Sequence, residues 1–76
     1  VYTRIEEHRV RAGLSRQELA DAVGVHYQTV GYLERGEYAP SLALALRIAR
    51  LVDVPVEQLF SLAPFDGADP TEEETA

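Results

Sequence analysis

The segment from Leu14 to Gly36, LSRQELADAVGVHYQTVGYLERG, constrains the fold of this chain more than any other. It opens with S-R-Q-E, in which Ser15 caps a helix and Glu18 reaches back to complete a capping box. Three apolar residues share one face of this helix: Leu19, Ala20 and Val23. Gly24 then ends the helix in the left-handed conformation. We therefore expect a short amphipathic helix followed by a tight turn.

A second helix is expected directly after this turn. It begins near His26, buries Val30 and Leu33, and ends at Gly36. Because the turn is too short for the two helices to lie antiparallel, their axes must cross steeply. This arrangement is a helix-turn-helix.

The order of residues in this unit also resembles a known family. Q-E-L-A-x-x-x-G-V is followed by T-V-x-x-L-E-R-G and then by P-S. Over roughly residues 4–60, this joint pattern resembles the Cro/C1-type (Xre-like) helix-turn-helix family of prokaryotic DNA-binding regulators. The resemblance implies that the second helix of the unit, residues 27–35, is a recognition helix that enters the major groove of DNA.

The flanking segments predict three more helices, which gives an all-α fold for residues 1–62. We expect a compact, lambda-repressor-like bundle of five short helices. The first helix runs from about Thr3 to Ala12 and opens with the capping-box pattern T-R-I-E. The family resemblance implies that Arg9 on this helix pairs with Glu34 of the recognition helix, and that the ion pair is structural.

A fourth helix is expected over residues 42–52, capped by Ser41. Its apolar residues form two neighbouring stripes. The first stripe is expected in the core: Leu42, Ala45, Leu46, Ala49 and Val52. The second stripe is expected at a subunit interface or under a fifth helix: Leu44, Ile48 and Leu51. That fifth helix begins at Pro55 and turns Val56, Leu59 and Phe60 inward.

The charge of the chain is unevenly distributed. The net charge is −6 over 76 residues, but residues 1–60 hold seven arginines and eight acidic residues, a net charge of −1. A nearly neutral domain is unfavourable for strong binding to DNA. Residues 63–76 form an acidic tail that is expected to be disordered, at least over residues 66–76, and that can occupy a basic site on a partner protein.

Several classes of protein are excluded or disfavoured. The chain has no cysteine, which excludes disulfides, thiolate metal sites and cysteine nucleophiles. No membrane span or signal-peptide pattern is present, so a cytoplasmic location is expected. His8 and His26 are isolated, and no acid or nucleophile lies at catalytic spacing. We therefore expect neither an enzyme nor a metal site, a cofactor or a membrane partner.

The outer face of the recognition helix supplies the expected contacts to bases. Because Val30 and Leu33 point inward, the opposite face projects outward. Gln28 lies on that face and can donate and accept at once, which suits the N6/N7 edge of adenine. The full set of candidate DNA-binding residues is Ser15, Arg16, Gln17, His26, Tyr27, Gln28, Thr29, Gly31, Tyr32 and Arg35.

Phosphate contacts are expected at the two edges of the unit. Ser15 and Arg16 lie at a helix N-terminus, where free amides favour an anion, and Arg35 lies at the opposite edge. Glu37 occupies a loop where the family often has a basic residue, which weakens the phosphate contact expected at this edge.

Gly31 lies inside the recognition helix, where glycine costs about 1 kcal/mol relative to alanine. It reflects either drift at a tolerant surface site or a close approach to DNA.

These features together predict a sequence-specific DNA-binding transcriptional regulator. We expect a repressor that binds a short palindromic operator in double-stranded DNA as a homodimer, through residues 27–35. The candidate interface residues are Leu44, Leu51, Phe60, Leu62 and Phe65. The alternative is an antitoxin or another protein-interaction module of the same fold, which the nearly neutral domain and Glu37 favour.

Overall fold

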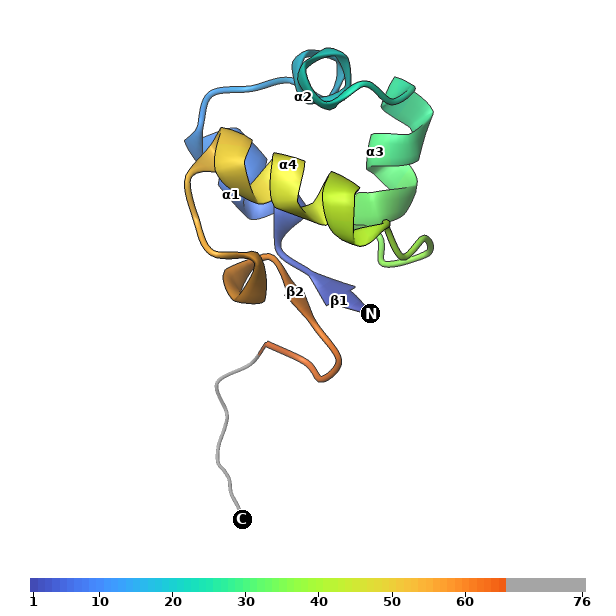
Figure 1. Ribbon diagram of the computed structural model, residues 1–76, viewed down its shortest axis with the longest axis vertical. Coiled ribbons are helices and arrows are strands. Elements are labelled where there is room, and N and C mark those ends of the chain that lie inside the picture. Colours follow the sequence, from blue (N-terminus) through green and yellow to red (C-terminus); the bar gives the residue numbers. More distant parts are fainter. Residues whose placement is uncertain (66–76) are drawn as a thin grey trace.

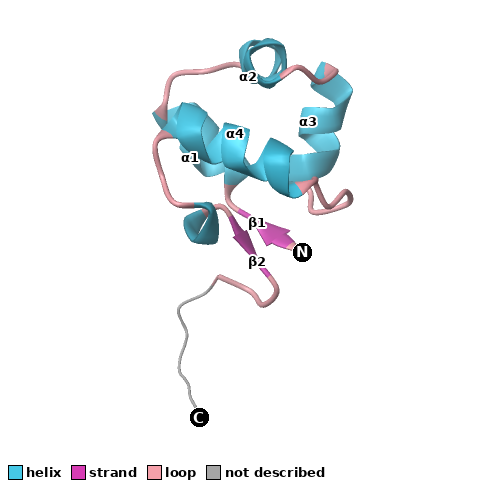
Figure 2. Ribbon diagram, viewed as in Figure 1, coloured by secondary structure: helices cyan, strands magenta, loops and turns pink. Residues whose placement is uncertain are grey.

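The computed structural model describes residues 1–65, which contain four α-helices (Figure 1). These helices are α1 (Ile5–Arg11), α2 (Arg16–Val23), α3 (Tyr27–Glu34) and α4 (Leu42–Val52). Two short strands, β1 (Tyr2–Thr3) and β2 (Phe60–Ser61), and a 3-10 turn over Val56–Gln58 complete the described fold (Figure 2). The predicted acidic tail beyond Phe65 lies outside the described residues.

Local capping defines the helix-turn-helix unit formed by α2 and α3. The Ser15 hydroxyl accepts from the Glu18 amide at 3.0 Å, and the Glu18 carboxylate accepts from the Ser15 amide at 2.8 Å. Gly24 takes the left-handed conformation with φ of 81°, which ends α2. His26 then caps α3 because its Nδ1 accepts from the Gln28 amide at 3.2 Å. Figure 1 shows α2 end-on and α3 from the side, so the two axes cross steeply.

One hydrophobic core fills the space between the helices. Its largest fully buried side chains come from all four helices and from the segment after the 3-10 turn: Ile5, Leu19, Val30, Leu33, Ile48 and Leu59. Because α2 and α3 both bury apolar side chains in this core, packing fixes which face of each helix points outward.

The prediction of a fifth helix is wrong. Pro55 is followed by a single 3-10 turn, and Phe60 already belongs to β2. Strand pairing with the N-terminal segment replaces the helix, since β2 runs antiparallel to β1 with Tyr2 opposite Ser61. Leu59 still turns inward and is buried. The fold is therefore a helical bundle with a small two-stranded sheet.

The predicted start of the first helix is also wrong. Thr3 lies in β1, α1 begins at Ile5, and the T-R-I-E capping box does not form. Pairing with β2 keeps the backbone extended through Thr3, whose hydroxyl instead donates to the Glu34 carbonyl at 3.1 Å. The Arg4 guanidinium donates to the Phe65 carbonyl at 3.3 Å. It also lies over the Phe65 ring, 4.4 Å from the ring centroid. The N-terminal segment thus contacts both the end of α3 and the chain after β2.

The bounds of α4 agree with the prediction, but the orientation assigned to its faces is partly wrong. Leu42 and Leu46, expected in the core, are 72% and 51% exposed. Leu44, expected at an interface, is buried in the core beside Ile48. The buried face also includes Ala45 and Ala49, so the inward direction falls between the two predicted stripes.

This correction predicts opposite effects for two neighbouring substitutions in α4. Ile48→Ala should destabilise the fold by about 2–5 kcal/mol, because it leaves a cavity in the core. Leu46→Ala should change stability by less than about 0.5 kcal/mol, because the side chain lies at the surface. Urea unfolding at low protein concentration measures both free energies. Similar losses for the two variants would place Leu46 back in the core.

Candidate nucleic-acid interface

The outer face of α3 presents hydrogen-bonding side chains to solvent. Tyr27, Gln28 and Tyr32 are exposed, whereas Val30 and Leu33 on the opposite face are completely buried. The rings of Tyr27 and the capping residue His26 are stacked, with their centroids 5.1 Å apart. The structure therefore gathers the central base-contact candidates on one accessible surface. Thr29, another candidate, is only partly exposed.

Gly31 belongs to this face but is covered rather than open. It is buried, and a Cβ atom added to it would lie 3.3 Å from Nη1 of Arg35. The guanidinium of Arg35 also lies over the Tyr32 ring, 5.1 Å from the centroid. Its Nε forms an ion pair with Glu37 at 3.2 Å. Arg35 thus folds back along α3 instead of extending away from its end.

A buried carboxylate fixes the end of α3. The Glu34 side chain is only 3% exposed, and its Oε2 accepts from Arg9 Nε at 2.6 Å. The ion pair expected from the family resemblance is therefore present. Arg9 Nη1 also donates to the Leu14 carbonyl at 2.8 Å. This single arginine connects α1, the segment before α2 and the end of α3.

Glu34 has a second partner that the sequence reasoning missed. Its Oε1 accepts from Arg16 Nε at 2.7 Å, although the sequence assigned Arg16 only to contacts with DNA. The hydrogen bond from Arg16 and the negative charge of Glu34 raise the pKa of the Arg16 guanidinium above its ordinary value. Glu6 lies 4.0 Å from Nη2 of the same arginine. The side chain remains 49% exposed, so its outer nitrogens stay accessible to a phosphate.

The other two candidates at the start of α2 are engaged within the chain. The Ser15 hydroxyl is used in the capping box, and the side-chain Nε2 of Gln17 donates to Oδ1 of Asp21 at 2.9 Å. The Glu18 carboxylate also places a negative charge at this helix end. Of the three candidates at this edge, Arg16 is therefore the one that carries a positive charge and is still partly exposed.

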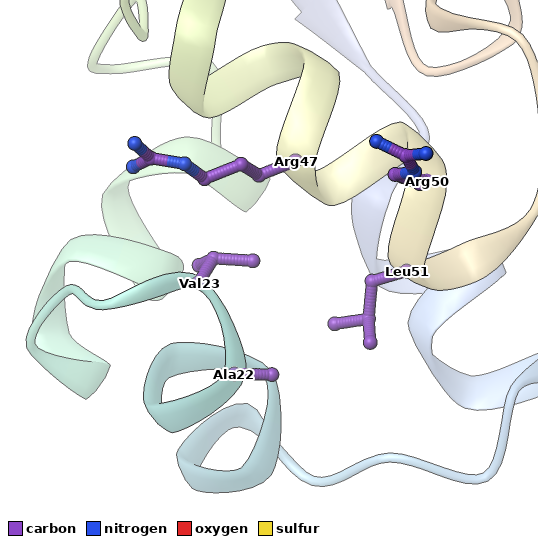
Figure 3. Close-up of a pocket in the computed structure, with 5 residues that line it drawn as sticks. All are labelled: Ala22, Val23, Arg47, Arg50 and Leu51. Carbon is purple, nitrogen blue, oxygen red and sulfur yellow. The ribbon is translucent and has the colours of Figure 1, made fainter.

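A shallow hollow lies between α2 and α4, and none of the residues that line it is a candidate for contact with DNA. It is lined by Ala22, Val23, Arg47, Arg50 and Leu51 (Figure 3). In this view the guanidinium groups of Arg47 and Arg50 lie at opposite ends of the hollow. The lining contains no carboxylate, histidine or hydroxyl group, so these residues do not supply an acid–base pair.

Within residues 1–65, no three histidine, cysteine, aspartate or glutamate side chains form a group that could hold a metal ion. Over the same part of the chain, every helix is too short or too polar to cross a bilayer.

The sequence matches the helix-turn-helix family over residues 5–59, which includes all four α-helices. The chain therefore belongs to this family, and its motif order is that of the Cro/C1-type members.

Relatives of this chain are named as regulators. An uncharacterised HTH-type transcriptional regulator of Methanothermobacter thermautotrophicus is 51% identical over 67 residues, which cover 87% of this chain and 96% of that protein. One of Archaeoglobus fulgidus is 48% identical over 58 residues, covering 76% and 83%. The crystal structure of the restriction-modification controller protein C.AhdI from Aeromonas hydrophila is similar, with 37% identity and a TM-score of 0.67. The similarity to C.AhdI covers 75% of this chain and 86% of that one.

The burial of the Arg9–Glu34 pair predicts a large effect of removing one partner. Arg9→Ala should destabilise the fold by about 3 kcal/mol or more, because it leaves a buried carboxylate with less compensation. Arg11→Ala is the matched control, since this arginine of α1 pairs with Glu7 at 3.0 Å on the surface. Its loss should cost less than about 1 kcal/mol. Thermal or urea unfolding that gave Arg9→Ala the stability of the wild type would contradict this account.

Proposed function

We propose that this protein is a cytoplasmic, sequence-specific DNA-binding regulator and not an enzyme. It binds a short palindromic operator as a homodimer and represses transcription. One observation carries the proposal: in a helix-turn-helix frame, α3 buries one face completely and presents Gln28 with flanking tyrosines on the other. The names of the relatives, which are transcriptional regulators and a controller protein, support the same class of function.

In this proposal α3 enters the major groove and its outer face meets the base edges. The Gln28 side chain donates to N7 of adenine and accepts from its N6 amino group, and this pair of hydrogen bonds specifies an A·T base pair at one position. Tyr27 and Tyr32 pack beside it, where their rings reach thymine methyl groups and their hydroxyls reach phosphates. Arg16, at the start of α2, holds a phosphate with its outer guanidinium nitrogens and so sets the register of α3.

Replacement of Gln28 tests this assignment directly. An operator is first selected from random duplexes at a stated salt concentration. Gln28→Ala should then weaken binding to it by about 1–3 kcal/mol, because the bidentate contact is lost, while binding to unrelated DNA stays the same. Gln58→Ala, at an exposed glutamine of the 3-10 turn, serves as the control. Unaltered operator affinity in Gln28→Ala would remove this residue from the interface.

The homodimer is proposed to form through the exposed apolar face of α4. Leu42 and Leu46 are adjacent on this helix and lie largely in solvent in the single chain. Phe60, an interface candidate from the sequence, and Leu42 both line a second shallow hollow, which is separate from the one in Figure 3. Burial of this surface between two copies would remove it from water. Leu44 has no place in this interface because it lies in the core of the single chain.

A charge placed at this surface should separate the two copies. Leu46→Glu would have to bury a carboxylate between apolar side chains, so we expect a folded monomer in sedimentation velocity and weaker binding to a palindromic operator. Val10→Glu introduces the same charge at an exposed valine of α1 and should leave the dimer intact. A dimer that persists in Leu46→Glu would rule out this interface.

The pairing of the arginines favours one alternative function. Arg9 and Arg16 contact Glu34, Arg11 contacts Glu7, and Arg35 contacts Glu37, so much of the basic surface is internally compensated. A surface with so little free positive charge suits a protein partner no less than it suits a polyanion such as DNA. If the protein is an antitoxin of this fold, its partner would be a basic toxin. Failure of the protein to select any DNA sequence, together with a stable complex with a basic partner protein, would favour this alternative.

A further inference from the structure

We propose that Arg35 reads a guanine base, and that Gly31 provides the space in which its guanidinium lies. The proposal rests on the DNA-binding function proposed above and deepens it by naming a second base-reading residue. It also gives a third explanation for the glycine inside α3. The two explanations considered so far are drift at a tolerant surface site and a close approach of the backbone to DNA.

The helical register places Arg35 among the base-reading candidates. Gln28, Gly31 and Arg35 are spaced by three and four residues and therefore share one face of α3. Helical side chains tilt toward the N-terminus, so Arg35 reaches back over the preceding turn. Nη1 and Nη2 lie 3.3 and 4.0 Å from the position that a Cβ atom at Gly31 would take. The guanidinium thus lies one turn from Gln28 on the DNA-facing side.

Two contacts hold the guanidinium in this place. It lies over the Tyr32 ring at 5.1 Å, a cation–π arrangement, and its Nε pairs with Glu37 at 3.2 Å. The nitrogen that pairs with Glu37 is Nε. Within residues 1–65, neither Nη1 nor Nη2 of Arg35 donates a hydrogen bond to a protein acceptor, so two donors of a rigid fork remain available. Such a pair matches the O6 and N7 acceptors that guanine presents in the major groove.

A base contact explains the geometry better than a phosphate contact. A side chain that binds phosphate from the end of α3 would extend sideways toward the backbone of the duplex. Arg35 instead folds onto the middle of the face that carries Gln28. A larger residue at position 31 would displace it, since even a methyl group is in tight contact with Nη1. Glycine is unfavourable within a helix, and the space that the Arg35 guanidinium needs accounts for its presence at position 31.

The test is binding-site selection from random duplexes at one salt concentration, with the wild type, Arg35→Lys and Gly31→Ala. We expect the wild type to select guanine at one position of each half-site. Arg35→Lys keeps the charge but loses the fork, so discrimination for that guanine should fall about 10-fold, with binding to unrelated DNA retained. Gly31→Ala should reduce the same discrimination, although thermal unfolding should show that it is more stable than the wild type.

The control and the contrary outcomes separate this proposal from the function on which it rests. Arg11→Lys, an exposed arginine of α1, should leave every preference unchanged. An equal loss of affinity for all sequences in Arg35→Lys would make Arg35 a phosphate contact and overturn the proposal. Retained guanine discrimination in Arg35→Lys would overturn it as well. If the wild type selects a sequence without guanine, only the role proposed for Arg35 is contradicted. If the wild type selects no sequence at all, the proposed DNA-binding function is contradicted as well.

Discussion

The carboxylate of Glu34 is the point on which the geometry of the helix-turn-helix depends. It lies buried at the end of α3 and accepts from Arg9 of α1 at 2.6 Å and from Arg16 of α2 at 2.7 Å. The carbonyl of the same residue accepts from Thr3 at 3.1 Å. A buried charge is costly unless it is fully paired, so this convergence favours one arrangement of the three helices over others. Its contribution is to orientation more than to net stability.

This constraint connects the core to the surface that faces outward. Val30 and Leu33 anchor one face of α3 in the core, while Glu34 fixes its end against α1 and α2. Rotation of α3 about its axis would expose these apolar side chains and break both ion pairs. The opposite face, with Gln28, is therefore held toward solvent, and a rigid scaffold of this kind orders few groups on binding.

The pairing of the arginines also shapes what kind of DNA binding is expected. Arg16 and Arg35 both lie at the proposed interface, and each is already in contact with a glutamate. Their nitrogens that point away from those carboxylates can still donate to DNA, but the net charge of the surface remains low. Such an interface gains little from non-specific attraction to the phosphate backbone. Discrimination between sequences then depends on the side chains of α3 that reach base edges.

Much of the helical frame could be predicted from local signals. Ser15 and Ser41 mark helix starts, and Gly24 marks an end, because caps depend on residues close in sequence. The inward faces of α2 and α3 follow from periodicity. The Arg9–Glu34 pair was expected only from the family resemblance, since nothing in the spacing of two residues so far apart indicates their contact.

The failures have a common physical origin in long-range contacts. The strand formed by Phe60 and Ser61 exists because Tyr2 and Thr3 pair with it, and no local pattern shows that pairing. For α4, the spacing of leucines gives the helical period but not the direction of the core, so Leu46 was placed on the wrong side. The candidate DNA-contact residues remain predictions, and Arg16 shows that a surface arginine can also have an internal role.

The most direct test of the central claim is a nuclear magnetic resonance titration of the labelled protein with its selected operator. If the face of α3 opposite Val30 and Leu33 meets DNA, backbone amides of Tyr27–Glu34 and of the start of α2 should show the largest shift changes. Amides of α1 and of the buried face of α4 should change little. The largest changes in α4 or in β1 and β2, with α3 unaffected, would contradict the account.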